Sequence, residues 1–420
     1  MSAKNCFLIA VFVLLQACGG GSKSPSTGGT SSVSSSHSSF LSASSNVPNS
    51  QSSISSWGTY SSMPADFPTG TVEALPVLDL NTEGAAAITS RETYINGNFT
   101  LTNAGVTDAS GSLEVRGRGN STWDWPKKPY RLKLTTSTSL LGMPKGKNWV
   151  LLANYADKTM VRNDVAFMFG RTLGFEWTPR AHYVELKLNG AYQGVYQLVE
   201  HIRIDKDRVN IDELKVADID SDKISGGYLM EIDFRHGLKY CETNSYDPVC
   251  QNGINTSRNV DFCIDSSRGM APACLANPET LHDPLWVNQR NYIETFYAEA
   301  EAALFGDNFK DPALGYAAYF DVDSVVNYYI QNELFRNVDG ASASFYMFKK
   351  RGGKLFFGPI WDFDLSMGNA GYNNASNITG VVDWVFHGTH GGTGSYQAEV
   401  NELLLWQRQR AYWMDAQLSL

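Results

Sequence analysis

Positive charge is scarce in this sequence. The 34 lysines and arginines are outnumbered by 43 aspartates and glutamates, so the formal net charge at pH 7 is −9. Proteins that bind nucleic acid non-specifically need an excess of basic side chains to neutralise the phosphates. The composition gives no support for that class of binding, and we expect no nucleic-acid partner.

The N-terminus lacks an apolar run long enough for a permanent membrane span. The run from Phe7 to Leu15 follows Lys4 and is too short to cross a bilayer, so residues 1–18 are typical of a signal peptide. The sequence LQAC, ending at Cys18, resembles the bacterial lipobox, in which the cysteine is lipidated; an ordinary signal peptide with an incidental cysteine is the alternative. We expect an extracytoplasmic lipoprotein of the cell envelope, most simply of the bacterial outer membrane, anchored through Cys18.

Residues 19–63 have almost no bulky apolar side chains. They are mainly Ser, with Gly and Thr, and such a composition cannot bury enough apolar surface to offset the entropy of ordering. We interpret them as a flexible linker. Residues 64–420 are rich in aromatic side chains and long enough for a large core, and we expect the folded domain there. The chain ends at QLSL without a turn signal, which is consistent with an incomplete final helix.

Cysteines are few, and four of the six lie in one stretch. We expect Cys6 to be removed with the signal peptide and Cys18 to carry the lipid, which leaves Cys241, Cys250, Cys263 and Cys274. These four lie in an insertion of about residues 236–285 that is rich in Asn, Pro and Gly. In an oxidising compartment they predict two local disulfides of undetermined connectivity. A four-cysteine zinc site is the alternative, which the lack of a CxxC pair disfavours.

The first half of the domain shows mainly strand patterns. Apolar residues alternate with polar ones over residues 99–101, 113–115, 130–134, 184–188 and 195–199. Asn189-Gly190 lies between the last two segments and predicts a type I′ hairpin turn. Residues 158–173 predict a helix whose apolar face carries Val161, Val165, Met168, Phe169 and Leu173.

The second half is mainly helical. Apolar residues recur at helical spacing from Ile293 to Leu304, and a second helix with Asp321 or Asp323 as its N-cap ends near Asn337. A hairpin over residues 345–357 follows. The chain therefore predicts an α+β fold with two lobes and a cleft, in which a strand-rich N-terminal lobe precedes a helix-rich C-terminal lobe.

Three aspartates form the sharpest candidate site. Asp339 follows the predicted helix, and Asp362 and Asp364 follow the hairpin, whose turn at residues 351–353 folds the two parts back towards each other. If the strand continues through Phe363, Asp362 and Asp364 point the same way, which suits a metal pair. Carboxylates on the ends of rigid elements are what a divalent metal with a bound polyphosphate requires. A structural calcium site or a capping cluster is the alternative.

The segment RGRGNSTWDWPKKPYRLKL places basic side chains beside a glycine turn. Arg118 precedes Gly119, and a glycine permits close approach of a ligand to the backbone. The spacing of a Walker loop is absent. A glycine turn before a basic strand, with no ligand, is the structural alternative.

Two lysines of this segment are candidates for binding phosphates. Lys128 has the same strand parity as the apolar Tyr130, so it is the better candidate if that face lines a cleft. Lys127 stays a candidate because the prolines around it can shift the start of the strand. Glu200 ends a later strand and is either the partner of such a lysine or a carboxylate at the rim.

Five segments in order resemble the CotH family, named for spore coat protein H. They are RGRGNSTWDWPKKPYRLKL, NWVLLANYADKTMVRN, GAYQGVYQLVEHIRI, GGYLMEID and NVDGASASFYMFKKRGGKLFFGPIWDFD, which together run across most of residues 75–369. The resemblance implies a fold like that of atypical secretory-pathway protein kinases. It also implies transfer of the γ-phosphoryl group of ATP to Ser or Thr of a protein with a divalent metal, Mg²⁺ or Mn²⁺.

The resemblance also assigns roles to individual residues. Asp339 would be the catalytic aspartate and Asp362 the metal-binding one, and Lys128 or Lys127 would meet the phosphates with Glu200 as partner. Protein kinases commonly place an Asn five residues after the catalytic Asp, and here that position is Ser344. Either Asp364 carries more of the metal load, or this subgroup has kept only a binding role.

Two other classes of function compete with the kinase hypothesis. A non-catalytic surface module would bind envelope protein or polysaccharide through exposed aromatic residues such as Trp123, Trp125 and Trp177, although buried core tryptophans are the simpler interpretation. A metal-dependent hydrolase is disfavoured because no His-rich or Ser-His constellation accompanies the aspartates.

Overall fold

Residues 74–103, 105–233, 262–267, 272–340, 343–370 and 396–418 are described in the computed structural model of the chain, and all lie in one compact unit. They contain both helices and strands, which confirms the α+β class. None of the helices in these ranges has the length and hydropathy of a membrane span.

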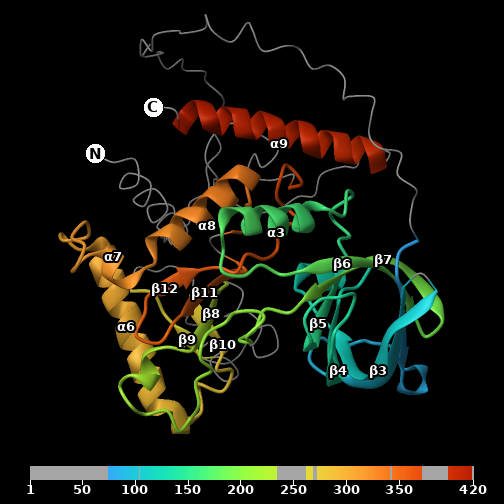
Figure 1. Cartoon of the computed structure of the whole chain (residues 1–420), viewed down its shortest axis with the longest axis horizontal. Helices are drawn as coiled ribbons and strands as arrows, with labels where there is room; N and C mark the ends of the chain where they lie inside the picture. Colours follow the sequence, from blue (N-terminus) through green and yellow to red (C-terminus); the bar gives the residue numbers. More distant parts are fainter. Residues whose placement is uncertain are drawn as a thin grey trace, which may run out of the picture. The chain divides into compact units, whose positions relative to one another are not determined.

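Seven strands of the first half close into a barrel in the order β1-β2-β3-β4-β5-β7-β6 (Figure 1). Neighbouring strands are antiparallel except β1 and β6, whose parallel pairing closes the barrel. The strands are β1 Val77–Thr82, β2 Ile95–Asn103, β3 Val106–Gly117, β4 Tyr130–Thr138, β5 Gly146–Leu152, β6 Ala181–Leu188 and β7 Ala191–Glu200. The short helices η3 Glu83–Ala85 and α2 Ser121–Asp124 lie in the connections.

The barrel interior is filled by every second residue of its strands. Leu132 and Leu134 of β4, Trp149 of β5 and Leu198 of β7 are fully buried in one apolar cluster. The apolar residues of these alternating strands therefore face the inside of a closed barrel, and the polar residues between them face the outside. The apolar face of β4 faces this interior, so the condition that favoured Lys128, an apolar face lining a cleft, is not met.

The hairpin predicted at Asn189-Gly190 is confirmed. β6 and β7 pair antiparallel on either side of it, with φ values of +50° for Asn189 and +79° for Gly190. A type I′ turn requires positive φ at both central positions, and Asn and Gly tolerate that region best.

A second, five-stranded antiparallel sheet follows in the order β12-β11-β8-β10-β9. Its strands are β8 Tyr228–Ile232, β9 Cys263–Ile264, β10 Ala273–Asn277, β11 Phe345–Lys349 and β12 Leu355–Phe357. Cys263 and Cys274 are directly opposite across β9 and β10 and form a disulfide. One local disulfide of the predicted insertion is thus present, and Cys241 and Cys250 lie outside the described residues.

The helices are α3 Arg162–Leu173, α6 Val287–Phe305, α7 Tyr316–Tyr319, α8 Val322–Phe335 and α9 Tyr396–Leu418, with short 3₁₀ turns η4 Lys223–Ser225 and η7 Pro284–Trp286. Asp321 is the N-cap of α8, because its Oδ1 accepts a hydrogen bond from the Ser324 N–H at 2.9 Å. Arg336 ends the same helix in the left-handed conformation. The predicted bounds and cap of this helix are confirmed.

The predicted apolar face of α3 is confirmed in part, because Val161, Val165 and Phe169 pack against a buried apolar cluster. Met168 is 56 % exposed, whereas Ala166, Phe167 and Gly170 are buried. Phe167 stacks on Trp361 with ring centroids 6.0 Å apart, and Gly170 lies against Ile360 where a larger residue would collide. The small residues Ala166 and Gly170 therefore face inward, and Gly170 lets the helix approach Ile360 closely. Apolar periodicity does not predict this face.

A second apolar core lies outside the barrel. It contains Phe167 of α3 and Phe335 of α8, together with the outward-facing Val150 of β5 and Val199 of β7. The barrel strands β5 and β7 therefore contribute to both cores. This shared packing fixes the residues that follow these strands relative to α3 and α8.

Candidate active site

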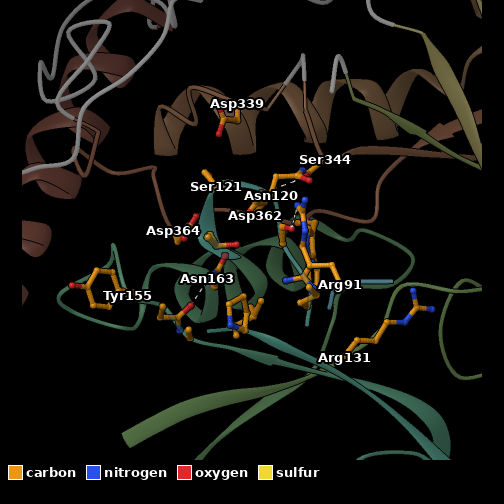
Figure 2. A pocket seen from close by; sticks show the side chains of 18 of the residues that line it. Arg91, Asn120, Ser121, Arg131, Tyr155, Asn163, Asp339, Ser344, Asp362 and Asp364 are labelled. Carbon is orange, nitrogen blue, oxygen red and sulfur yellow. Dashed lines mark hydrogen bonds between the residues drawn. The ribbon is translucent and has the colours of Figure 1, made fainter. Parts of the chain in front are cut away.

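A pocket of about 270 Å³ collects charged side chains from segments far apart in the sequence (Figure 2). Its lining combines residues next to β3, β4 and β7 with residues of the second sheet and of the chain after α8 and β12. Six carboxylates and four arginines line it: Glu92, Glu231, Asp233, Asp339, Asp362 and Asp364, with Arg91, Arg116, Arg118 and Arg131. The pocket thus holds the three predicted aspartates and Arg118.

The turn after α8 presents Asp339. The Asp339 N–H donates to Asn337 Oδ1 at 3.3 Å, and Asn337 Nδ2 donates to Asn332 Oδ1 at 3.0 Å. The Tyr328 hydroxyl donates to the Gly340 carbonyl at 2.5 Å, and a Cβ at Gly340 would collide with the Asn332 side chain. These bonds fix the backbone on both sides of Asp339, which is half-buried at the pocket.

Asp362 and Asp364 do not continue a strand, so the parity argument for them was wrong. β12 ends at Phe357, and Asp362 has a φ of +66°, in the left-handed region. The Phe363 N–H donates to Asn163 Oδ1 at 2.8 Å, which holds the residue between the two carboxylates. A turn, rather than an extended strand, brings both aspartates to the pocket.

Residues 154–163, just before and at the start of α3, hold this turn in place. Asn163 Nδ2 donates to Asn154 Oδ1 at 3.3 Å, and Asn154 Nδ2 donates to Gln197 of β7 at 3.1 Å. Farther along, Asn369 Nδ2 donates to the Ala156 carbonyl at 3.2 Å. The barrel therefore positions the aspartates through a chain of buried amides.

The carboxylates of this turn are crowded together. Burial, followed by the charge of Asp362 and then of Asp157 and Asp339, raises the pKa of Asp364 well above the ordinary value. Asp364 and Asp362 also share a side-chain hydrogen bond. A pair of like charges that retains a proton in this way is a natural place for a cation to replace that proton.

Ser344 occupies the position where protein kinases commonly have Asn, and it lies beside Asp362. Its hydroxyl donates to Asp362 Oδ2 at 3.3 Å, and its φ is +52°. Ser344 therefore supports the orientation of Asp362.

Arg118 lies near the aspartates. Its guanidinium is 5.5 Å from the centroid of the Trp361 ring. Burial lowers its pKa, and the charge of Asp362 is the largest influence that favours the charged form. Arg91 Nη1 donates to the Gly119 carbonyl at 2.9 Å, and Gly119 has a φ of +90°, which favours glycine. The predicted glycine turn thus belongs to the pocket.

Lys127 and Lys128 do not line the pocket. Lys127 Nζ donates to the Val195 carbonyl and, at 2.8 Å, to the Ala153 carbonyl, and burial lowers its pKa to about 8. Lys128 Nζ donates to the Trp123 carbonyl at 2.5 Å. Both ammonium groups satisfy backbone carbonyls, so their predicted role in binding phosphates has no support in this arrangement.

Glu200 pairs with arginines rather than with either lysine. It is fully buried and accepts hydrogen bonds from Arg180 at 2.8 and 2.9 Å, while Arg208 Nη2 lies 3.4 Å from its Oε1. The next residue, His201, lines the pocket instead. The predicted pairing of Glu200 with Lys127 or Lys128 was therefore wrong.

Sequence reasoning missed the side chains that give the pocket its basic wall and its supports. These are Arg91, Arg116, His201, Tyr346, Glu231 and Asn163. Arg131 was considered only as one of the positive charges that follow the glycine turn. Burial, then the charges of Arg131, Arg118 and Arg203, lowers the pKa of His201 well below its usual range, so its imidazole is neutral near pH 7. Matched arginines on the polar face of two consecutive strands were the signal that was available.

Comparison with known families adds one finding. Residues 115–387 match the family model described as CotH kinase protein, a range that includes the three aspartates, Arg116, Arg118 and Arg131. A comparison with curated proteins finds no match.

Proposed function

Because the chain belongs to the CotH kinase protein family, we propose that it transfers the γ-phosphoryl group of ATP to Ser or Thr side chains of a protein substrate, using Mg²⁺ or Mn²⁺. One observation carries the proposal beyond family membership. A single pocket brings Asp339, Asp362 and Asp364 together with four arginines. Carboxylates for a metal and guanidinium groups for phosphates are what phosphoryl transfer needs.

The acidic residues fit a divalent cation. Burial, and after it the charge of Asp362, raises the pKa of Asp364, and a cation would remove the repulsion between the two carboxylates. Within the described ranges no three His, Cys, Asp or Glu side chains form a complete metal site. This suits Mg²⁺, which is usually held by one or two carboxylates while phosphates and water supply the other ligands.

The proposed roles follow from these positions. Asp362 and Asp364 hold the cation, and Ser344 keeps Asp362 oriented through its hydroxyl. Asp339 orients the hydroxyl of the acceptor and accepts its proton. Arg118, next to Asp362, binds a phosphate oxygen. When bound, ATP supplies the phosphoryl group, and the metal ion neutralises charge on its phosphates.

In this proposal the barrel and the helix-rich remainder are the two lobes of a kinase-like fold. Residues 1–18 are a signal peptide, residues 19–63 a flexible linker, and residues 64–420 the kinase-like domain. Cys18 carries a lipid that keeps the enzyme at a membrane of the cell envelope. The linker lets the domain reach protein substrates at some distance from that membrane.

Transfer of labelled phosphate from ATP tests the proposal. The chain from residue 19 onward is incubated with γ-labelled ATP and Mn²⁺, with itself and a generic protein as acceptors. We expect labelled Ser or Thr in the wild type, no transfer but intact nucleotide binding in Asp339→Ala, and loss of metal-dependent nucleotide binding in Asp362→Ala. Absence of both transfer and metal-dependent nucleotide binding in the wild type contradicts the proposal.

A non-catalytic binding module is the second candidate function. At the edge of the same pocket Trp125 and Tyr155 have ring centroids 5.9 Å apart, and Tyr155 is 39 % exposed. Aromatic rings at a pocket edge are suited to stacking on a sugar or a peptide side chain. Nucleotide binding without transfer in the wild type would favour this second function.

A further inference from the structure

Two arginines of the pocket lie directly opposite each other in the barrel sheet. Arg116 of β3 and Arg131 of β4 are partners in the strand register, and both line the pocket. On the same two strands and the same face, the neighbouring partners are Glu114 and Lys133, which form an ion pair at 2.7 Å. Like charges directly opposite destabilise a sheet, whereas opposite charges stabilise it.

The like-charged pair therefore does not stabilise the pairing of β3 with β4. One step along the strands the same face carries complementary charges, so a carboxylate opposite Arg131 would fit the same architecture. At the pocket the chain has two guanidinium groups instead. A charge arrangement that weakens the free protein at a pocket is typical of a site completed by a ligand.

In the part of the chain that the structure describes, neither arginine pairs directly with a carboxylate. Among the described residues, no ion pair within 4.0 Å involves Arg116 or Arg131. Arg116 Nη1 donates to the carbonyls of Arg91 and, at 3.2 Å, of Gly117, and its guanidinium is 5.1 Å from the Tyr94 ring centroid. Backbone carbonyls and an aromatic face hold this guanidinium in place without cancelling its charge.

Within the described part of the chain, two polar atoms on this side of the pocket are buried without a hydrogen-bond partner. They are Arg131 Nε and His201 Nδ1. Arg131 Nε is always a donor, and a buried donor without an acceptor is destabilising, so an oxyanion at this place would supply the acceptor that it lacks. Figure 2 shows the Arg131 side chain extending away from Asp362 and Asp364, so this place is separate from the acidic turn.

We infer that Arg116 and Arg131 form a second subsite of the pocket, which binds a phosphoryl group. Two adjacent guanidinium groups present a fork of donors that matches the several oxygens of a phosphate. The inference rests on the proposed function for the source of that group, which is either the polyphosphate chain of the nucleotide or a phosphorylated side chain of the acceptor. The existence of the subsite rests on the arginine pair alone.

Binding of inorganic tripolyphosphate without metal tests the subsite. The chain from residue 19 onward is titrated by calorimetry in EDTA, as wild type and as Arg131→Met and Arg116→Met. We expect the dissociation constant to rise about tenfold or more in each methionine variant, because a charge-assisted hydrogen bond is lost. Arg131→Lys, which keeps the charge, should lie between Arg131→Met and the wild type.

Lys133→Met is the matched control. Lys133 lies on the same strand and face as Arg131 but does not line the pocket, so its removal should leave the dissociation constant unchanged. Thermal unfolding without ligand checks that the variants fold. Equal affinity in the wild type, Arg131→Met and Arg116→Met, or no binding in the wild type, overturns the inference.

Two further titrations identify the source of the phosphoryl group. If the arginine variants weaken metal-free ATP as much as tripolyphosphate, the subsite takes the nucleotide. If they weaken tripolyphosphate and a phosphoserine peptide but leave metal-free ATP unchanged, the subsite takes the acceptor. If tripolyphosphate binding depends on the arginines but the wild type transfers no phosphate, the proposed function is rejected and the subsite is kept. If the wild type transfers phosphate but tripolyphosphate binding does not depend on the arginines, the subsite is rejected and the proposed function is kept.

Discussion

The acidic and the basic wall of the pocket are built in different ways. Asp362 and Asp364 stand on a tight turn with a left-handed residue, fixed by the side-chain amide of Asn163. Arg116 and Arg131 stand on paired strands of a closed barrel, and the strand register sets their positions. The acidic wall therefore depends on a few buried hydrogen bonds, whereas the basic wall depends on the whole barrel.

The walls also share a property that explains the pocket. Each wall gathers charges of one sign. Within the described residues, none of the four arginines forms a direct ion pair with a carboxylate of the acidic wall. Only a ligand that carries both a cation and anionic oxygens relieves both walls together. A metal-bound polyphosphate is such a ligand.

The largest expected effect is on the acidic wall. Asp362→Ala should weaken metal-dependent nucleotide binding by about 100-fold or more, because loss of a ligand exceeds loss of an outer-shell partner. Tripolyphosphate binding in EDTA should change little, since the arginines remain. Calorimetry of both ligands checks this, and an equal loss for both would show that the walls are one site.

Asn163→Ala should have a smaller effect confined to the same wall. It leaves the Phe363 N–H without its acceptor and loosens the turn, so metal-dependent affinity should fall about tenfold. Asn327→Ala is the matched control, because Asn327 Nδ2 donates to the Leu173 carbonyl at the other end of α3. A similar loss in both variants would point to general destabilisation of α3 rather than to the turn.

Ser344→Asn should strengthen the acidic wall. The φ of +52° at this position suits Asn better than Ser, and an amide oxygen is a better metal ligand than a hydroxyl. We expect the affinity for Mn²⁺-ATP to rise about threefold, the size of one modest hydrogen bond. A fall in affinity would show instead that the Ser344 hydroxyl is needed on Asp362.

Lys127→Met and Lys128→Met should have the smallest effect on binding, less than about twofold, the range of substitutions away from the functional site. Both lysines donate to backbone carbonyls and do not line the pocket that contains the arginine pair. Loss of tripolyphosphate binding in either variant would restore the lysines as phosphate ligands and reduce the arginines to a supporting role.

Lys127 also predicts a pH effect on stability. Its pKa is lowered by burial to about 8, so between about pH 8 and the ordinary lysine value the unfolded chain binds more protons than the folded one. The free energy of unfolding should therefore receive a contribution that increases with pH across this window. Urea titrations from pH 7 to 10 should show a flatter increase in Lys127→Met.

The acidic wall could be predicted from sequence because it is nearly local. The end of α8 and the hairpin of β11 and β12 are both visible as patterns, and together they bring Asp339 near Asp362. The left-handed residue at Asp362 was not visible, so the strand parity was wrong while the gathering of the aspartates was right.

The sequence shows the arginines of the basic wall on the polar faces of two consecutive strands, but their meeting at one pocket depends on barrel closure and could not be predicted. The pairing of β1 with β6 joins residues more than 100 positions apart, from Val77 with Glu185 onward. Closure puts the apolar face of β4 inside, and so directs Arg131 on the opposite face towards the pocket. Local alternation identifies two faces of a strand but does not say which one meets a ligand.

The most direct test of the central claim is a titration of ATP into the wild-type chain from residue 19 onward, first with Mn²⁺ and then with EDTA. The account predicts binding in both conditions, weaker in EDTA because only the arginine wall then contributes. Equal affinity in the two conditions, or no heat of binding in either, would contradict a pocket that joins a metal site to a phosphate site.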